Sequence, residues 1–452
     1  MRSRNMLEGP LLGNIIGYTI PIILTGFLQL LFNAADLIIV GRYCGELSVA
    51  AVGNCGSISM LIVNLFIGLS VGTTVAVAHS IGAGSPEAVS HTVHTAVPTA
   101  IVSGIIVAIV GVFGNKTFLT MMGTPDTVLP LSSIYMKIYF MGMPFIMLYN
   151  FCASILRATG DTKTPLFLLA MSGVINVGLN VIFVTQFDMN VAGVALATTI
   201  SQGVAAILVV LALMKRTDAC KLTLSKMRFY KPQLLRIIRI GLPAGIQSSL
   251  FSISNVLIQS SINSFGDIVM SGNAAAANID GFLYVILNGF HQTALNFISQ
   301  NAGAKQYQRV RKILTICLGC VCVLGISVSA IVYFAGPTLL SFYIPDSAEA
   351  IGWGMVRLTF LCIPYFLCGM MDVSTGALRG MGASVAPMII SVLGVCGIRI
   401  GWIATIFQLP SFHTPECLYA SYTVSWVTTF VCQMIAFFLI YRKRAKAAAT
   451  SS

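Results

Sequence analysis

The chain has 452 residues, of which 56% are hydrophobic and only 9% are charged. This composition excludes an ordinary soluble domain and indicates a membrane protein. The net charge of +12 would suit nucleic-acid binding, but the placement of the basic residues explains it better.

Apolar runs long enough to cross about 30 Å of hydrocarbon recur from end to end of the chain. None shows the alternation of about ten residues that is typical of outer-membrane strands, so helices must satisfy the backbone hydrogen bonds. We therefore expect an all-α polytopic membrane protein with about 12 transmembrane helices. The runs lie at 11–34, 54–78, 92–113, 131–155, 166–187, 191–214, 236–263, 274–299, 313–336, 355–377, 386–408 and 418–441.

The basic residues gather on one side of the predicted membrane. With the N-terminus inside, 21 of the 26 Lys and Arg residues fall in cytoplasmic segments, eight of them between Lys215 and Arg239. Cytoplasmic loops carry such an excess of positive charge. The first run lacks the short length and A-x-A exit of a cleavable signal peptide. We expect a multi-pass protein of the cell inner (plasma) membrane with both termini in the cytoplasm, and no nucleic-acid partner.

The second half of the chain repeats the plan of the first at offsets of 220 to 222 residues. Six helices per half give both halves the same orientation, which predicts two parallel six-helix lobes related by a pseudo-two-fold axis along the membrane normal. We expect an N-terminal lobe at 1–214, a basic cytoplasmic linker at 215–235 that also contacts membrane lipid, a C-terminal lobe at 236–441 and a cytoplasmic tail at 442–452. The matched positions are Pro21 with Pro243, Asn33 with Asn255, Gly45 with Gly266, Gly82 with Gly303, Pro125-Asp126 with Pro345-Asp346, and Leu156-Arg157-x-x-Gly160 with Leu378-Arg379-x-x-Gly382.

Two parallel lobes suit alternating access about a central cavity, so the architecture favours a transporter. A channel would carry a filter motif of the TVGYG kind, which the sequence lacks. The chain has no Gly-Lys pair, hence no phosphate-binding loop, and no H-E-x-x-H helix. We expect no enzyme activity and no cofactor, and an Na⁺ or H⁺ gradient as the source of work.

One carboxylate, Asp36, lies near the outer end of the first run, and the second half has no acid at the matching place. A charge in hydrocarbon is expensive and usually marks ion or substrate traffic. Gln29, Asn33 and Asp36 share one helical face, as do Asn176 and Asn180. The predicted coupling residues are Asp36, Asn33, Asn176, Asn180 and Thr198, whose oxygens suit a transient Na⁺, while Asp36 can also exchange a proton. The alternative is that the Asn and Thr residues only join neighbouring helices.

The second half carries a different set of buried charges, namely Asp280, Asp372 and Arg399. An ion-paired network of these three would either keep the lobe in register or handle substrate. A cavity for flat hydrophobic ligands would need aromatic, Met and amide side chains, although such residues at helical spacing more often belong to the core. The candidates are Gln29, Tyr135, Tyr139, Met143, Gln202 and Phe251.

Several motifs, in this order across the two halves, resemble the multidrug and toxic compound extrusion (MATE) family. They are Asn33-Ala-Ala-Asp36-Leu-Ile-Ile-Val-Gly41-Arg42, Ile81-Gly82-Ala83-Gly84, Leu156-Arg157-x-x-Gly160-Asp161, Ser299-Gln300-Asn301-x-Gly303-Ala304 and Leu378-Arg379-Gly380-x-Gly382. The resemblance implies a prokaryotic Na⁺- or H⁺-coupled antiporter that exports organic, often cationic or amphipathic, compounds through a V-shaped pair of lobes, working as a monomer.

The resemblance also implies roles for single residues. The acid of the family's first helix matches Asp36, and its polar cluster matches Asn176, Thr198 and Tyr135. Two departures stand out. Asn180 replaces an Asp of some relatives, and the seventh helix has neutral residues such as Gln247 where some relatives have an acid. We therefore expect coupling in the first lobe.

Two other functions stay open at this point. A flippase for a lipid-linked precursor would need several cations facing the cavity to meet a pyrophosphate, and only Lys137, Arg357 and Arg399 are candidates. A receptor or channel would bind ligand or pass current without gradient-driven transport.

Overall fold

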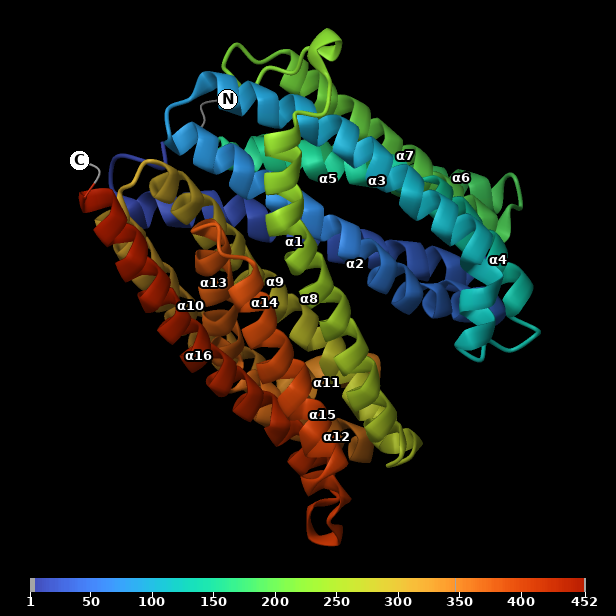
Figure 1. Ribbon diagram of the computed structural model, residues 1–452. Coiled ribbons are helices and arrows are strands. Elements are labelled where there is room, and N and C mark those ends of the chain that lie inside the picture. The colour runs from blue at the N-terminus through green and yellow to red at the C-terminus, as the bar shows by residue number, and fades with distance from the viewer. Residues whose placement is uncertain (1–4, 346, 451–452) are drawn as a thin grey trace. The chain divides into compact units, whose positions relative to one another are not determined.

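The computed structural model describes residues 5–345 and 347–450, with the side chains of residues 57 and 58 left out. All regular secondary structure in this part of the chain is helical (Figure 1). Arg2, Arg4 and Asp346, which entered the charge and repeat arguments, lie outside the described residues. The prediction of an all-α protein is confirmed.

The chain forms two compact units, and two long helices are shared between them. Unit 1 holds Leu24–Ser249, and unit 2 holds Met6–Ile23 together with the chain from Leu250 onward. Helix α1 (Leu11–Tyr43) and helix α8 (Lys231–Asn263) therefore each contribute one part to either unit. Both contain an internal proline, Pro21 and Pro243, close to the division. The divisions thus fall inside helices, whereas the lobe boundaries predicted from the sequence follow the loops.

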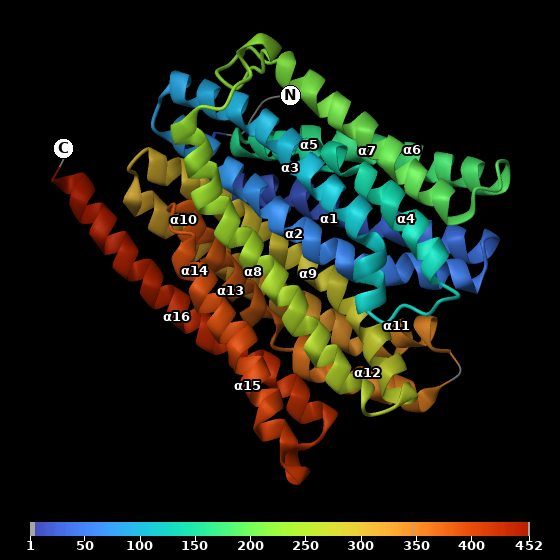
Figure 2. The same ribbon diagram turned by 45° about the vertical axis from the view of Figure 1, so that its right-hand side comes forward.

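Unit 1 contains the later part of α1, the early part of α8 and the helices between them. In both views α6 and α7 run side by side (Figures 1 and 2). The remaining elements are α2 (Glu46–Gly82), α3 (Pro86–Met121), α4 (Leu129–Met141), α5 (Met143–Ala158), α6 (Lys163–Thr185), α7 (Asn190–Met214) and the 3₁₀ turn η1 (Leu224–Lys226).

Unit 2 is built around one large apolar core, to which α9, α10, α13 and α16 contribute. Two of its segments, η2 and η3, are π-helical. Its elements after α8 are α9 (Asp267–Gly303), α10 (Tyr307–Phe334), α11 (Gly336–Tyr343), α12 (Ala348–Arg357), η2 (Leu358–Cys362), α13 (Tyr365–Gly380), α14 (Val385–Ser391), η3 (Val392–Gly397), α15 (Ile398–Ala404), η4 (Ile406–Gln408), η5 (Pro410–Phe412) and α16 (Pro415–Ala449).

The predicted runs at 131–155 and 355–377 are each broken into two helices. Helices α4 and α5 meet at 45°, and the segments Ala348–Cys362 and Tyr365–Gly380 meet at 43°. Pro144 lies in the first turn of α5 and Pro364 directly precedes α13. A proline at these positions removes no helical hydrogen bond, because the first turn leaves its N–H groups unpaired.

Among the described residues, eight helices are long and apolar enough to span a membrane, or ten if each bent pair is one span. The two further long helices are α8 and α9, of 33 and 37 residues. Their length exceeds the roughly 20 residues that a span requires, and they are less apolar because of Gln, Ser, Asn and, in α8, several Lys and Arg residues. The twelve segments agree with the twelve predicted runs.

The backbone conformation confirms the internal repeat. Residues with positive φ, the region that favours glycine, recur at matching positions of the two halves. The matched pairs are Gly45 (82°) with Gly266 (92°), Gly84 (66°) with Lys305 (57°), and Gly160 (89°) with Gly382 (78°). Gly45 and Gly266 are the N-caps of α2 and α9. The repeat therefore extends to the local turns that start and end corresponding helices.

Within unit 1, α2 crosses the early part of α8 at very short distance. A Cβ on Gly68 would lie 2.2 Å from the backbone N of Gly245, and a Cβ on Gly72 would lie 2.2 Å from the carbonyl oxygen of Ile237. Both helices carry a G-x-x-x-G pattern at the crossing, Gly68 with Gly72 and Gly241 with Gly245. Such small-residue faces let membrane helices approach until their backbones touch. This crossing fixes the early part of α8 in unit 1.

Candidate functional site

The carboxylate of Asp36 meets three polar side chains of α6 and α7 inside unit 1. Asn180 Nδ2 donates to Asp36 Oδ1 at 2.5 Å and to Asn176 Oδ1 at 3.3 Å. Asn176 Nδ2 donates to Thr198 Oγ1 at 3.3 Å, and the Thr198 hydroxyl donates to the Val194 carbonyl at 3.0 Å. We call Asp36, Asn176, Asn180 and Thr198 the Asp36 cluster. Four of the five predicted coupling residues are thus brought together, and Asn33 is the one that is not.

The cluster forms because helical spacing and helix pairing coincide. Asn176 and Asn180 are four residues apart on α6, so both face the same neighbours. Asn176 and Asn180 are 5% and 0% exposed, and Asp36 is half-buried. Two buried amides can be retained here because each is hydrogen-bonded, which offsets the loss of hydration.

The cluster leaves one amide oxygen without a hydrogen bond beside the carboxylate. Asn180 Oδ1 is buried and makes no hydrogen bond with any described residue. Asp36 supplies the negative charge, while the amide and hydroxyl oxygens supply neutral ligands. Hard cations such as Na⁺ prefer this set of oxygens, and a carboxylate can hold a proton at the same place. The arrangement is therefore able to bind a monovalent cation.

Gln29 and Asn33 share the face of α1 predicted from the sequence, but both side chains are exposed. Neither hydrogen-bonds a member of the Asp36 cluster in the part of the chain described. Gln202 on α7 is half-buried. The role of Asn33 in coupling, and of Gln29 and Gln202 in a cavity, stays a prediction.

The aromatic candidates of unit 1 lie on α4. Tyr135 and Tyr139 stack with ring centroids 6.1 Å apart and planes at 9°, and Tyr135 also packs against the apolar cluster of Val40 and Val184. Both tyrosines are half-buried. Met143 is 0% exposed and lies in a closed apolar cluster, so it has no open face in this structure. Phe251 belongs to unit 2, where it packs against the core.

The expected network of Asp280, Asp372 and Arg399 is not formed. Among the described residues, Asp280 is instead paired with Arg357, whose Nε donates to Asp280 Oδ2 at 3.0 Å. Arg357 also donates to Asn273 Oδ1 at 2.7 Å. The partner was missed because spacing along the chain does not show which turn of α12 faces α9. The sequence did carry a signal for this pairing, because Arg357 is one of few basic residues outside the predicted cytoplasmic segments.

Asp372 and Arg399 have other partners. The backbone carbonyl of Asp372 accepts a 2.6 Å hydrogen bond from Nδ1 of His291. Arg399 Nε donates to Ser425 Oγ at 3.0 Å, and its guanidinium lies 4.0 Å from the ring centroid of Tyr422. The three predicted residues thus belong to separate groups in the part of the chain described: Asp280 pairs with Arg357, the Asp372 carboxyl interacts electrostatically with Arg379, and Arg399 contacts Ser425 and Tyr422.

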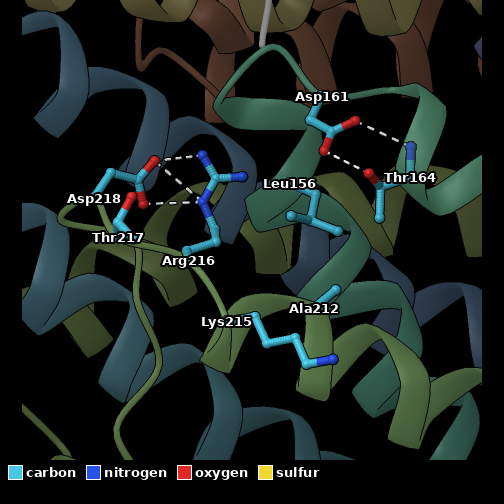
Figure 3. A pocket seen from close by; sticks show the side chains of 8 residues that line it. All are labelled: Leu156, Asp161, Thr164, Ala212, Lys215, Arg216, Thr217 and Asp218. Carbon is cyan, nitrogen blue, oxygen red and sulfur yellow. Dashed lines mark hydrogen bonds and ion pairs between the residues drawn. The ribbon is translucent and has the colours of Figure 1, made fainter. Parts of the chain in front are cut away.

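A pocket of about 360 Å³, which the sequence did not predict, lies where α5 and α7 end and α6 begins, next to the basic linker (Figure 3). Asp161 accepts from the Thr164 backbone N–H at 3.0 Å and from its hydroxyl at 2.6 Å. Arg216 forms an ion pair with Asp218, and this hydrogen-bonded guanidinium lowers the pKa of the Asp218 carboxyl. Two acidic residues, Asp161 and Asp218, and two basic residues, Lys215 and Arg216, line the pocket, so it has no concentrated charge of one sign.

Comparison with known proteins agrees with the repeat and the fold. The MatE family profile matches twice, at residues 21–182 and 243–403. "Probable multidrug resistance protein YoeA" of Bacillus subtilis is 25% identical over 390 residues, covering 85% of this chain and 84% of that protein. "Multidrug export protein MepA" of Staphylococcus saprophyticus is 21% identical over 435 residues, covering 94% and 93%.

Solved structures show the same fold. A MATE crystal structure in the bent conformation superposes with a TM-score of 0.88 at 21% identity, over 100% of both chains. The outward-facing structure of a multidrug resistance MATE family transporter of the MOP superfamily superposes with a TM-score of 0.88 at 22% identity, over 99% of both chains. With two profile matches that together span most of the sequence, this chain belongs to the MatE family of multidrug efflux transporters.

Proposed function

We propose that this transporter is a secondary active antiporter that exports organic, cationic or amphipathic compounds in exchange for Na⁺ or H⁺, with coupling at the Asp36 cluster. The observation that carries the proposal is the 2.5 Å hydrogen bond from Asn180 to Asp36 beside the unpaired Asn180 Oδ1. It brings one negative charge and one unpaired amide oxygen together inside unit 1. The multidrug resistance and export proteins among its relatives support the substrate class.

The coupling follows from the charge of the cluster. With a cation bound, Asp36 is neutralised; without it, a carboxylate remains in a poorly hydrated place, where charge is expensive. When the site is empty, the conformation that hydrates Asp36 is therefore favoured. When a cation is bound, the conformation that encloses Asp36 is favoured. A ligand shifts a conformational equilibrium only by its difference in affinity for the two states. Exchange results if the organic substrate favours the state that the coupling cation disfavours.

We also propose the cellular location and the division into lobes that the sequence predicts. The protein works as a monomer in the plasma membrane with both termini in the cytoplasm, a lobe at 1–214, a linker at 215–235, a lobe at 236–441 and a tail at 442–452. The basic linker supports this orientation because Lys and Arg accumulate on the cytoplasmic side. Membrane lipid with anionic headgroups would contact it.

The test is transport in liposomes that contain the purified protein. A fluorescent organic cation is loaded, and an Na⁺ gradient and a pH gradient are imposed in separate experiments. We expect one gradient to drive movement of the dye, and Asp36→Asn to abolish it. Asp161→Asn, which alters a carboxylate in the turn between α5 and α6 outside the cluster, is the matched control and should transport normally.

Two results would contradict the proposal. Normal gradient-driven transport by Asp36→Asn would remove coupling from the cluster. No transport by folded wild-type protein under either gradient would point to the flippase, with a labelled lipid-linked precursor as the next cargo. The structure makes the flippase the weaker candidate, because Asp280 already neutralises Arg357 and too few cations remain for a pyrophosphate.

A further inference from the structure

Arg399 is a buried cation that unit 2 does not neutralise. Its residue is 4% exposed. Of the five N–H donors of its guanidinium, one, on Nε, is used in the hydrogen bond to Ser425. In the part of the chain that the structure describes, no carboxylate lies within ion-pair distance of Arg399, and neither terminal nitrogen makes a hydrogen bond. Four donors thus remain for a ligand.

Arg357 provides the comparison within the same unit. Its side chain is 12% exposed, but Asp280 pairs with it and Asn273 accepts from its Nη1 at 2.7 Å. Unit 2 therefore supplies a counter-ion within ion-pair distance to Arg357 but, among the described residues, none to Arg399. A cation within the membrane that lacks a counter-ion is expensive and usually serves a pathway or a ligand, so the open donors of Arg399 require an explanation beyond packing.

The guanidinium of Arg399 lies over aromatic rings of α16. The guanidinium lies 4.0 Å from the centroid of Tyr422 and 6.0 Å from that of Trp426. Trp426 is in turn held by Tyr365, edge-on at 5.5 Å and 88°. Stacking on a ring leaves the edge of the guanidinium, with its parallel N–H groups, available to a planar anion. The ring of Tyr422, which is half-buried, offers contact area to an aromatic ligand, while Trp426 is buried behind it.

The backbone also indicates a specialised site. The π-helical segment η3 ends at Gly397, two residues before Arg399. Its inserted residue shifts the direction of the side chains that follow, and π segments are frequent at functional sites. A Cβ on Gly394 would lie 2.2 Å from Thr429 Oγ1 on α16, so η3 is packed tightly against the helix that carries the rings. Helices α15 and α16 run side by side in both views (Figures 1 and 2).

We infer that Arg399, with Tyr422 and Trp426, binds the carboxylate of an aromatic amphipathic substrate. The preferred cargo is therefore zwitterionic, carrying a carboxylate as well as a positive charge, rather than purely cationic. A carboxylate matches the fork of the guanidinium in two parallel hydrogen bonds. This inference rests on the proposed export function and specifies the substrate class of that function.

A matched pair of dyes tests the inference. Rhodamine 110 has a free carboxylate, and rhodamine 123 is its methyl ester with the same ring system and positive charge. Binding of each dye to purified wild-type protein is measured by fluorescence anisotropy. We expect rhodamine 110 to bind about tenfold or more tightly than rhodamine 123, as a charged hydrogen-bonded pair would give. Equal binding of the two dyes by wild-type protein would overturn the inference whatever any variant does.

Variants then assign the preference to Arg399. Arg399→Gln should lose the preference by weakening rhodamine 110 binding about tenfold while rhodamine 123 binding stays within about twofold. Arg399→Lys, which keeps the charge without the fork, should lie between them. Equal weakening of both dyes, or of neither, would show that Arg399 has a structural role only. If Arg399→Gln does not fold, the binding of both dyes to Arg399→Lys and to wild-type protein still tests the inference.

Transport of the two dyes separates this inference from the proposed function. If a gradient drives rhodamine 123 as fast as rhodamine 110, the antiporter stands and the carboxylate preference falls. If neither dye moves but wild-type protein binds rhodamine 110 more tightly, the anion site stands and the antiport proposal falls.

Discussion

Alanine at Gly68 should destabilise the protein, whereas alanine at Gly53 of the same helix should not. A Cβ on Gly68 would lie 2.2 Å from Gly245 N, 2.4 Å from Gly245 Cα and 2.7 Å from Gly241 O. All three are backbone atoms, so no side-chain rotation relieves the overlap. Ordinary contact begins at 3.4 Å, so the two helices must move apart by about 1.2 Å. A Cβ on Gly53 meets nothing within 4 Å.

The expected magnitudes follow from this difference. Overpacking of this kind costs about 1–3 kcal/mol, while replacing an unconstrained helical Gly by Ala gains about 0.5–1 kcal/mol. We expect Gly68→Ala to lower the midpoint of thermal unfolding in detergent and Gly53→Ala to leave it unchanged or raise it. Intrinsic fluorescence during heating, with identical scan rates, measures both. Equal midpoints for the two variants, or a higher midpoint for Gly68→Ala, would refute the close crossing of α2 and α8.

Three further predictions concern charges. Asn180→Asp places a second carboxylate at hydrogen-bond distance from Asp36, so cation binding should tighten by about 1 kcal/mol or more. Calorimetric titration with Na⁺ at fixed pH measures this change. Weaker or unchanged binding would remove position 180 from the site. Asp280→Asn leaves Arg357 buried without its counter-ion and should destabilise unit 2 by about 3–5 kcal/mol. The double variant Asp280→Asn, Arg357→Met should recover much of that loss in a thermal scan, and a double variant no better than the single one would contradict the pairing. Asp218 has a lowered pKa because Arg216 hydrogen-bonds it. Its stabilisation is therefore present above its ordinary value of 3.8 and lost as the pH falls further. Since its side chain is 48% exposed, solvent screening limits the effect to about 1 kcal/mol or less; wild type and Asp218→Asn should differ at pH 7 and converge in acid, and a difference that grows in acid would show that the sign is wrong.

The helices and the repeat could be predicted because both depend on local sequence. Long apolar runs predict spans since hydrocarbon forces the backbone to bond to itself. Glycines such as Gly45 and Gly266 occupy turns with positive φ, so matched glycines in the sequence predict matched turns in the structure. The bends at Pro144 and Pro364 had a local signal too, in the proline itself, although the apolar run continues through each bend.

The site was predicted only in part, because contacts between helices depend on rotation and depth that spacing does not specify. Asp36, Asn180 and Thr198 were expected together since each is a rare polar group in an apolar run, and the hydrogen bonds join them. The pairing of Asp280 with Arg357 was missed because spacing along the chain does not show which turn of α12 faces α9. The π segment before Arg399 has no composition that sets it apart from an α-helix.

The sharing of α1 and α8 between units has a consequence for any attempt to divide the gene. A cut in the linker looks natural, because it separates two equivalent sets of helices. Yet the first fragment would leave unit 1 without Gly241 and Gly245, and the second would leave unit 2 without Met6–Ile23. Neither fragment carries a complete folding unit. Two such polypeptides would have to be produced in the same membrane and complement one another before either reached its native packing.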